Sequence, residues 1–245
     1  MKTQTGFLGF FDILGYQSLL VNNDPNVIAE NVLSQLTTLN KSIGKKLADT
    51  ITSFDETVYH EIYKKNLKWL VFSDTILISL DVPSETTASD TYDRLLIFLL
   101  SSIILQQNLL LAGLPLRGAL TFGDYLIKDA CFAGRPIIEA YALAEKLELS
   151  ACVVAPSAKK MFVDILETGN LNHKLLLDYM VPLKNSESLK LLTLNYGSME
   201  DGEDPRDIVF KSFFAHNKDI PEKVQQKILN TEQHLRFLDI YHKTK

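Results

Sequence analysis

The chain has 245 residues, of which 46% are hydrophobic, so it can bury a sizeable core in one large domain or in a domain with an appendage. Its 25 basic and 30 acidic residues give a net charge of −5, and it holds no basic run that would track a nucleic-acid backbone. This composition argues against nucleic acid as a partner. The two cysteines, Cys131 and Cys152, lack CxxC or Cys/His ligand spacing, which favours a reducing cytoplasm.

The first part of the chain predicts a strand followed by a helix. Residues 5–13 form an apolar run that ends at Asp12-Ile13, and Leu14-Gly15 supply a turn. The stretch Asn22-Asn23-Asp24-Pro25 then signals a helix start. Apolar residues recur at helical spacing over 26–48, at Val27, Val32, Leu36, Leu39 and Ile43. The N-terminus shows no signal-peptide pattern, because no small-residue cleavage site follows its apolar stretch.

Two apolar runs in the next segment predict a tight β-hairpin. "LKWLVF" (67–72) and "TILISLDV" (75–82) are rich in strand-forming residues, and only Ser73-Asp74 separates them. The tip of the hairpin therefore carries an acid, Asp74.

A long apolar helix is predicted over 90–113, with Gly113 as its end and Pro115 beyond it. The stretch 95–116 could span a bilayer by its length, but Gln106, Gln107 and Asn108 would be costly near the middle of a membrane. We therefore expect a buried or interface helix and no membrane partner.

The second half of the chain continues the alternation of strands and helices. We expect a strand over 114–126, a helix over 136–149, a strand over 151–156, a helix over 157–166 and two late strands, "KLLLDYMVPL" and "SLKLLTLNY". Residues 198–218 are acidic and turn-rich at their start, which predicts a linker. Asp219 with Glu222 resembles a capping box, and the helix behind it has one apolar seam. That seam favours docking on the helix's own domain over pairing with another chain.

The two strand-end acids indicate a metal site. Ends of strands that neighbour each other in one sheet lie close together, so Asp12 and Asp74 can converge. Two carboxylates at one place repel unless a cation lies between them, and Mg²⁺ or Mn²⁺ suits oxygen ligands. The Gly15 turn could present backbone N–H groups to phosphate oxygens. Each acid alone could instead be structural, Asp12 as a cap and Asp74 as a hairpin residue.

These residues also carry a resemblance to a known family. "FFDILGY" (10–16) resembles the first metal motif of class III nucleotidyl cyclases, and "VFSDTILIS" (71–79) resembles their metal-bearing hairpin, with serine in place of the usual glycine before Asp74. "LPLRGALTFGD" (114–124) and "AGRPIIEAYALAEKLE" (133–148) are similar to the strand and helix that follow in this family. The likeness runs in order over residues 5 to about 195. Within the family, the chain looks most like the bacterial pyrimidine cyclases of phage-defence systems.

The resemblance implies an α+β, ferredoxin-like class III nucleotidyl cyclase fold: a central, mostly antiparallel sheet flanked by helices, plus the C-terminal helix. It divides the chain into a cyclase domain (1–197), an acidic linker (198–218) and a C-terminal helix (219–245). It also implies a head-to-tail homodimer with active sites at the interface. Each site would hold two Mn²⁺ or Mg²⁺ ions on Asp12, Asp74 and the Ile13 carbonyl. The nucleotide-binding residues implied are Phe11, Ile13, Leu14, Gly15, Tyr16 and Ser73.

The chain departs from the purine-specific members of this family. The paired Asn and Arg on the helix after the glycine are missing in either register, at Ile138 and Ala142 or at Ala142 and Lys146. Leu70 and Cys131 replace the lysine and acid that select the base. The missing positive charge at the triphosphate could come from Arg117, Arg135 or Lys146, with Arg117 taken as the catalytic candidate. Arg117 could equally be a solvated charge at a strand end.

The function expected from this resemblance is cyclisation of UTP, or of CTP, to the 3′,5′-cyclic nucleotide and pyrophosphate. The product would be a second messenger in antiviral defence that acts on a separate effector without direct contact. The alternatives are a catalytically silent module that works through dimerisation, and a purine cyclase acting on ATP or GTP. No His-Glu-x-x-His or Gly-x-Ser-x-Gly motif supports a zinc or serine hydrolase.

Overall fold

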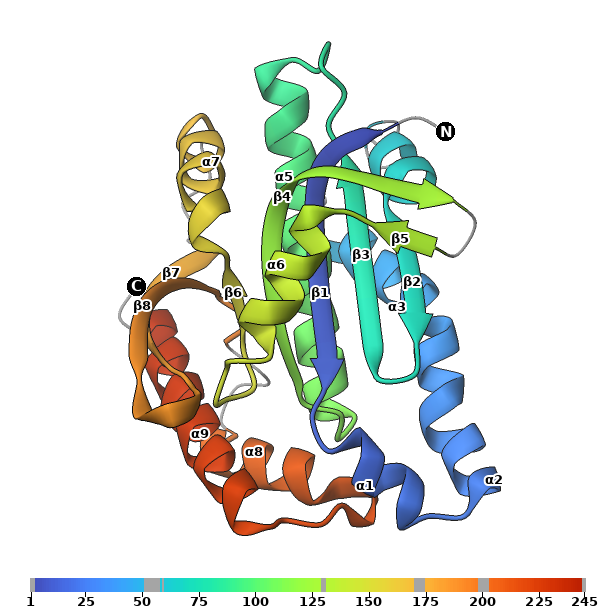
Figure 1. Cartoon of the computed structure of the whole chain (residues 1–245), viewed down its shortest axis with the longest axis vertical. Coiled ribbons are helices and arrows are strands. Elements are labelled where there is room, and N and C mark those ends of the chain that lie inside the picture. Colours follow the sequence, from blue (N-terminus) through green and yellow to red (C-terminus); the bar gives the residue numbers. More distant parts are fainter. Residues whose placement is uncertain are drawn as a thin grey trace.

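The computed structural model describes residues 3–50, 58, 60–128, 131–169, 175–197 and 203–243. Within this part of the chain, eight strands form one sheet in the order β2-β3-β1-β4-β6-β8-β7, with β5 paired to β4 (Figure 1). The strands are β1 (Gln4–Ile13), β2 (Lys68–Phe72), β3 (Thr75–Asp81), β4 (Leu116–Lys128), β5 (Cys131–Ala133), β6 (Cys152–Val154), β7 (Leu176–Pro182) and β8 (Ser188–Leu194). All pairs are antiparallel except β4 with β6. The prediction of a mostly antiparallel sheet is confirmed.

The central strands set the position of the two acids. Strand β1 lies between β3 and β4, and Asp12 pairs in register with Thr75 on one side and with Arg117 on the other. The predicted hairpin is confirmed, with Ser73-Asp74 connecting β2 and β3. Asp74 therefore directly precedes the residue opposite Asp12.

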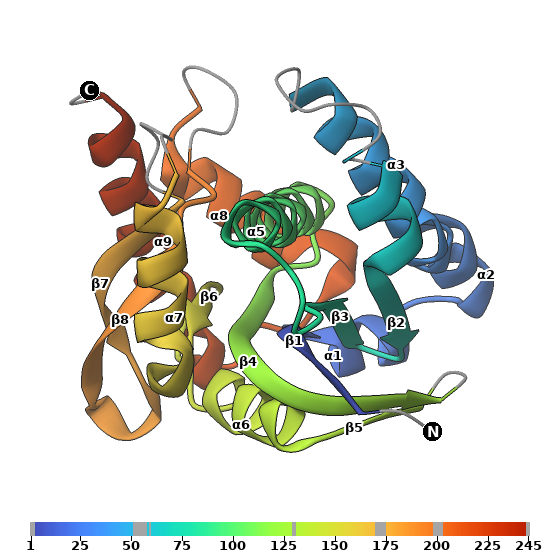
Figure 2. The ribbon, with the colours of Figure 1, turned by 90° about the horizontal axis from the view of Figure 1, so that it is seen from above.

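Alternation along the strands gives the sheet two buried faces. Phe7 and Phe11 of β1 belong to a large core with α5 (Ala88–Leu111), whereas Leu8 and Phe10 belong to a smaller core with α6 (Arg135–Ala144). Figure 2 shows α5 and α6 on opposite sides of the sheet. Asp12 follows Leu8 and Phe10 by period two, so it lies on the α6 face.

The predicted long helix is confirmed as α5, which Thr87 caps by accepting a hydrogen bond from the Asp90 N–H. By length and composition α5 could cross a membrane, and 72% of its most apolar stretch is buried inside the protein. Gln106 is fully buried and its Nε2 donates to the Leu116 carbonyl across 2.9 Å. The amide N–H group of one of the three polar residues that would be costly in a bilayer is thus hydrogen-bonded within the core.

The helix predicted over 26–48 is interrupted by a π-helical turn. It consists of α2 (Pro25–Ile28), the π turn η1 (Ala29–Leu33) and α3 (Ser34–Thr50), and a second π-helical segment, η2 (His60–Asn66), precedes β2. Leu36, Leu39 and Ile43 are buried as predicted, but Val27 is 45% exposed and Ile28 is buried instead. The wider π turn changes the phase of the buried face, which a constant 3.6-residue period cannot anticipate.

The C-terminal part packs on the same core as the sheet. The predicted linker over 198–218 contains α8 (Pro205–Phe214), capped by Asp204, and the short turn η4 (Ala215–Asn217), while residues 198–202 lie outside the described part. The last helix, α9 (Glu222–Lys243), buries Ile228, Leu235 and Leu238 in the main core. Its docking on its own domain is confirmed, and the three-part division of the chain stays a prediction.

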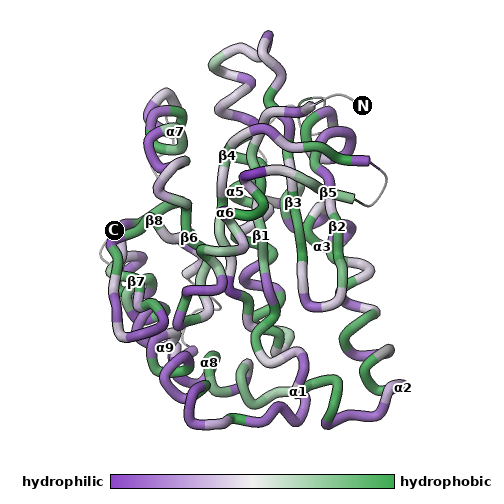
Figure 3. The backbone as a smooth tube through the Cα atoms, in the orientation of Figure 1, coloured by the Kyte–Doolittle hydropathy of each residue, from purple (hydrophilic) through white to green (hydrophobic). Residues whose placement is uncertain are grey.

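The predicted capping box at the start of α9 is wrong. The Val224 N–H donates to the Pro221 carbonyl, so the helix begins after Pro221, and the Asp219 carboxylate accepts a hydrogen bond from Ser18. Asp219 therefore joins two distant segments and does not cap its own helix. Figure 3 shows the chain entering α9 as mostly hydrophilic.

Three further elements complete the described chain. They are α1 (Tyr16–Val21), α7 (Pro156–Glu167) and η3 (Lys184–Ser186). Of these three, α7 agrees with the helix predicted over 157–166. The sequence did not predict α1 and β5, which are too short for a clear periodic signal, or α8, which lies in the segment predicted as a linker.

Candidate active site

A cavity of about 820 Å³ lies at the end of β1, and both strand-end acids line it. The Ile13 N–H donates to the Asp74 carbonyl across 3.0 Å, so the hairpin tip is held against the end of β1. The negative charge of Asp74 is one cause of a raised Asp12 pKa. Two acids 62 residues apart in sequence are therefore placed on one concave surface.

Asp12 is neutralised within the chain by Arg117. Arg117 Nε donates to Asp12 Oδ2 across 2.7 Å, and Arg117 Nη2 pairs with the Glu145 carboxylate just beyond α6. Only 12% of the Arg117 side chain and 17% of the Asp12 side chain are exposed. Burial is the main cause that raises the Asp12 pKa, and the positive charge of Arg117 opposes it.

The turn after β1 adopts the conformation that favours glycine. Gly15 has a φ of 79°, and it starts α1, whose first turn is closed by a hydrogen bond from the Leu19 N–H to the Gly15 carbonyl. A Cβ atom at Gly15 would lie 3.0 Å from Cδ of Lys218. Ile13, Leu14, Gly15 and Tyr16 all line the cavity, which is the arrangement expected of a backbone cradle for phosphate.

Phe11 and Ser73 stand apart from the cavity. Phe11 is fully buried beneath the sheet, where a Cβ atom at Gly118 would approach its ring to 2.6 Å. It can support the turn but does not present itself to a ligand there. Ser73 has a φ of 56° and lines a second hollow of about 390 Å³ with Tyr16 and Trp69. The hairpin tip thus sends Asp74 to one cavity and Ser73 to another.

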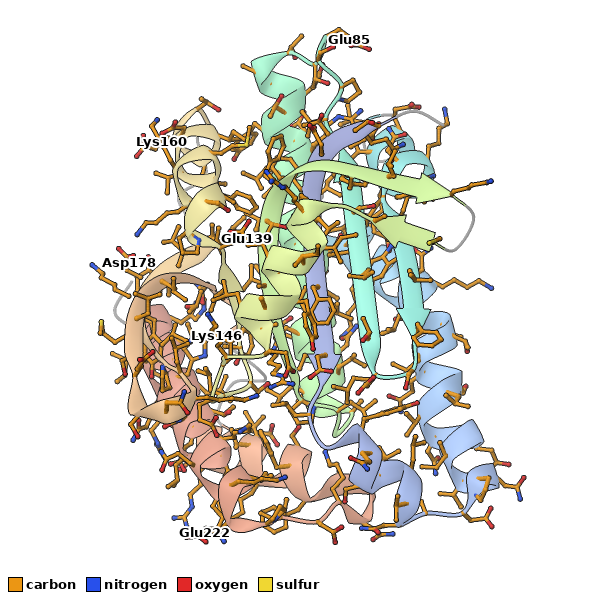
Figure 4. All side chains as sticks on the ribbon, in the orientation of Figure 1. Glu85, Glu139, Lys146, Lys160, Asp178 and Glu222 are labelled. Carbon is orange, nitrogen blue, oxygen red and sulfur yellow. The ribbon has the colours of Figure 1, made fainter. Side chains whose placement is uncertain are left out.

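The three basic candidates differ in their placement. Arg117 lines the cavity but is bonded to two carboxylates, whereas Arg135 and Lys146 are not among its lining residues. Figure 4 shows Lys146 just beyond the end of α6. The structure adds basic residues that the sequence did not single out for this site: Lys184, Lys223 and Lys227.

The two positions that the resemblance assigns to base selection, Leu70 and Cys131, and one position of the missing Asn and Arg pair, Ile138, stand outside the cavity. Leu70 packs on the smaller core, Cys131 is an exposed free thiol and Ile138 is 68% exposed. Glu139 accepts a hydrogen bond from Ser157 across 2.5 Å, so it serves to connect two helices (Figure 4). None of these side chains lines the cavity with Asp12.

The donor set is suited to a hard divalent ion. Within the described ranges, no group of three or more His, Cys, Asp and Glu side chains could hold a metal. Asp12 and Asp74 are a carboxylate pair with a nearby backbone carbonyl at Ile13, and oxygen donors of this kind fit Mg²⁺ or Mn²⁺. The remaining ligands of such an ion would come from water and phosphate oxygens.

Comparison with known proteins agrees with this architecture. No protein-family model and no curated protein match the chain. Among solved structures, the adenylyl cyclase CyaB from P. aeruginosa is 14% identical with a TM-score of 0.50, covering 79% of this chain and 96% of that one. The catalytic core of a rhodopsin-guanylyl cyclase with converted specificity, solved in complex with ATPαS, is also 14% identical, with a TM-score of 0.48. That match covers 79% of this chain and 96% of the other. The likeness to CyaB shows that the chain has the predicted class III cyclase fold.

Proposed function

We propose that the chain is a divalent-metal-dependent nucleotidyl cyclase. The observation that carries this proposal is the convergence of Asp12, Asp74 and the Gly15 turn on one cavity. A fold shared with an adenylyl cyclase supports the reaction class.

In this proposal Asp12, Asp74 and the Ile13 carbonyl would hold two Mn²⁺ or Mg²⁺ ions. Such ions supply Lewis acidity at the ribose 3′-hydroxyl and charge neutralisation at the departing pyrophosphate. The backbone from Ile13 to Tyr16 binds and orients the triphosphate, and Phe11 keeps the turn in place from below. Arg117 orients the Asp12 carboxylate through its Nε hydrogen bond. In this proposal, its guanidinium also contacts the phosphates.

We propose a pyrimidine nucleoside triphosphate, UTP before CTP, as the substrate. Leu70 and Cys131 lack the hydrogen-bonding groups by which purine-specific relatives select their base, and this favours a smaller base. ATP or GTP is the alternative substrate. The active enzyme would be a homodimer in the cytoplasm, and its cyclic UMP or CMP would act on a separate effector in antiviral defence.

A second candidate is a catalytically silent module. The observation that favours it is the Arg117 bond to Asp12, because a fixed guanidinium can replace a metal as the partner of that carboxylate. The retained Asp74 favours an enzyme, since no described residue forms an ion pair with it.

The test is incubation of the purified protein with each of the four nucleoside triphosphates and Mn²⁺, followed by chromatography for 3′,5′-cyclic products. We expect cyclic UMP or cyclic CMP from the wild type and none from Asp74→Ala. Cyclisation of none of the four would contradict the enzyme proposal. Preference for ATP or GTP would contradict the substrate assignment alone.

A further inference from the structure

One wall of the candidate active site comes from the C-terminal segment. Asp219, Pro221, Lys223, Val224 and Lys227 line the same cavity as Asp12 and Asp74. Figure 1 shows the start of α9 at the same end of the molecule as α1, and Figure 4 labels Glu222 there. The last helix therefore does more than complete the core, because its first two turns face the predicted phosphate turn.

Hydrogen bonds connect this wall to α1, the helix that directly follows the Gly15 turn. Ser18 Oγ donates to Asp219 Oδ2 across 3.0 Å and accepts from the Asp219 N–H across 2.6 Å. Asn22 Nδ2 donates to the Asn217 carbonyl across 2.9 Å. The start of α9 is thus held in a defined place relative to Gly15.

A buried lysine strengthens the same junction. The Lys218 ammonium donates to the carbonyls of Gly113 and Ser212 across 2.6 and 2.9 Å, and its side chain packs on Gly15. Within the described part of the chain, no carboxylate forms an ion pair with it. Its positive charge adds to the potential behind the turn.

The charges on the cavity wall leave one lysine unneutralised. Arg117 and Lys184 pair with Glu145, and Lys227 pairs with Glu148. Lys223 is exposed and forms no ion pair with any residue that the structure describes. A solvated surface lysine would look the same by exposure alone, but Lys223 shares a cavity with the unpaired acid Asp74 and the glycine turn.

We propose that Lys223 binds the polyphosphate of the nucleotide, so that the C-terminal helix is part of the substrate site. This inference rests on the proposed function for the identity of the natural ligand. The required chemistry is that of a polyanion whose oxygens accept a charge-assisted hydrogen bond from an ammonium group. Arg117 is already bonded to two carboxylates, so Lys223 would supply positive charge at the phosphates in addition to that of Arg117.

Inorganic tripolyphosphate is the probe, because its binding does not require turnover. We compare the full-length wild type, Lys223→Gln and Lys223→Glu by isothermal titration calorimetry with Mn²⁺ present. The matched control is Lys243→Ala, which removes a lysine from the last turn of the same helix, about 30 Å away along its axis. Thermal unfolding of each variant verifies that it is folded.

We expect Lys223→Gln to weaken tripolyphosphate binding about tenfold, as for loss of one charge-assisted hydrogen bond. Lys223→Glu weakens it further, and Lys243→Ala binds like the wild type. Equal affinity of wild type and Lys223→Gln, or no binding by the wild type, would overturn the inference. If Lys223→Gln weakens binding while no nucleotide is cyclised, the inference stands and the cyclase proposal falls. If Lys223→Gln cyclises a nucleotide with an unchanged KM, the cyclase proposal stands and the inference about Lys223 falls.

Discussion

Arg117 and Asp12 face each other across the β1–β4 pair and are joined by a 2.7 Å hydrogen bond between Nε and Oδ2. Both side chains are mostly buried and have lost most of their hydration. The attraction between the two charges offsets the free energy that this desolvation costs. When no cation is bound, the Arg117 guanidinium provides the positive charge that stabilises the buried Asp12 carboxylate. This dependence makes the pair a sensitive reporter of cation binding at Asp12.

Replacement of Arg117 by alanine should destabilise the fold by about 3 kcal/mol, because Asp12 is left buried without its partner. Mn²⁺ should restore part of that loss, since a cation at Asp12 replaces the missing charge. Thermal unfolding with and without Mn²⁺ measures both effects. The Mn²⁺-induced rise in Tm should be larger for Arg117→Ala than for the wild type.

The control is Arg94→Ala, which breaks a pair of similar burial at the far end of β3. Arg94 Nη1 donates to the carbonyl and the carboxylate of Asp81 across 2.8 and 3.3 Å. This variant should be destabilised without selective rescue by Mn²⁺. Equal rescue of both variants would mean that Mn²⁺ acts elsewhere than at Asp12.

A glycine at position 73 should stabilise the hairpin. Ser73 has a φ of 56°, a left-handed conformation that costs a non-glycine residue about 1 kcal/mol. Ser73→Gly should raise the free energy of unfolding by roughly 0.5 kcal/mol, after the greater backbone entropy of glycine in the unfolded chain is deducted. Urea unfolding measures the change. Ser84→Gly, at a turn position without positive φ, should be neutral or destabilising.

The buried Lys218 predicts a pH-dependent stability. Burial lowers its pKa from 10.5 to about 8, so between these two values the unfolded chain binds more protons than the folded one. Stability from this group therefore rises with pH through that window, by up to about 3 kcal/mol. Lys218→Met lacks the titrating group. The free energy of unfolding of the wild type minus that of this variant, measured by denaturant unfolding, should therefore increase from pH 7.5 to pH 10.5. A constant difference would contradict a depressed pKa.

The docking of α9 should make a large contribution to stability. Leu238 is fully buried in the main core, whereas Leu229 on the same helix is 50% exposed. Leu238→Ala should lower the free energy of unfolding by about 3 kcal/mol through lost transfer energy and a cavity. Leu229→Ala should change it by less than about 0.5 kcal/mol. Similar values for the two variants in urea unfolding would contradict the docked position of α9.

The sequence was sufficient for the elements with strong local signals. The apolar run over residues 5–13 and the two-residue connection at Ser73-Asp74 predicted the strand and the hairpin that carry the acids. The buried seam of α9 was also predicted, because a 3.6-residue period records which face of a helix is apolar.

The sequence could not show what that face contacts. Ser18 and Asp219 are 201 residues apart, and no local pattern records that their hydrogen bond brings the start of α9 to the Gly15 turn. Asp219 fits a local capping pattern, which predicts a cap for α9. In the structure its carboxylate instead accepts the hydrogen bond from Ser18. The cationic wall at Lys223 and the pairing of Arg117 with Glu145 were missed for the same reason.

The central claim is that Asp12 and Asp74 hold a divalent cation together. Electron paramagnetic resonance measures Mn²⁺ binding directly for the wild type and for Asp74→Ala. The Asp74 carbonyl accepts the Ile13 N–H in either case, so the fold should persist. The control is Asp178→Ala, which removes an exposed acid paired with Lys159 and Lys190.

The account predicts Mn²⁺ binding by the wild type and by Asp178→Ala, and at least about tenfold weaker binding by Asp74→Ala. Equal Mn²⁺ affinity in all three proteins, or none in the wild type, would contradict it.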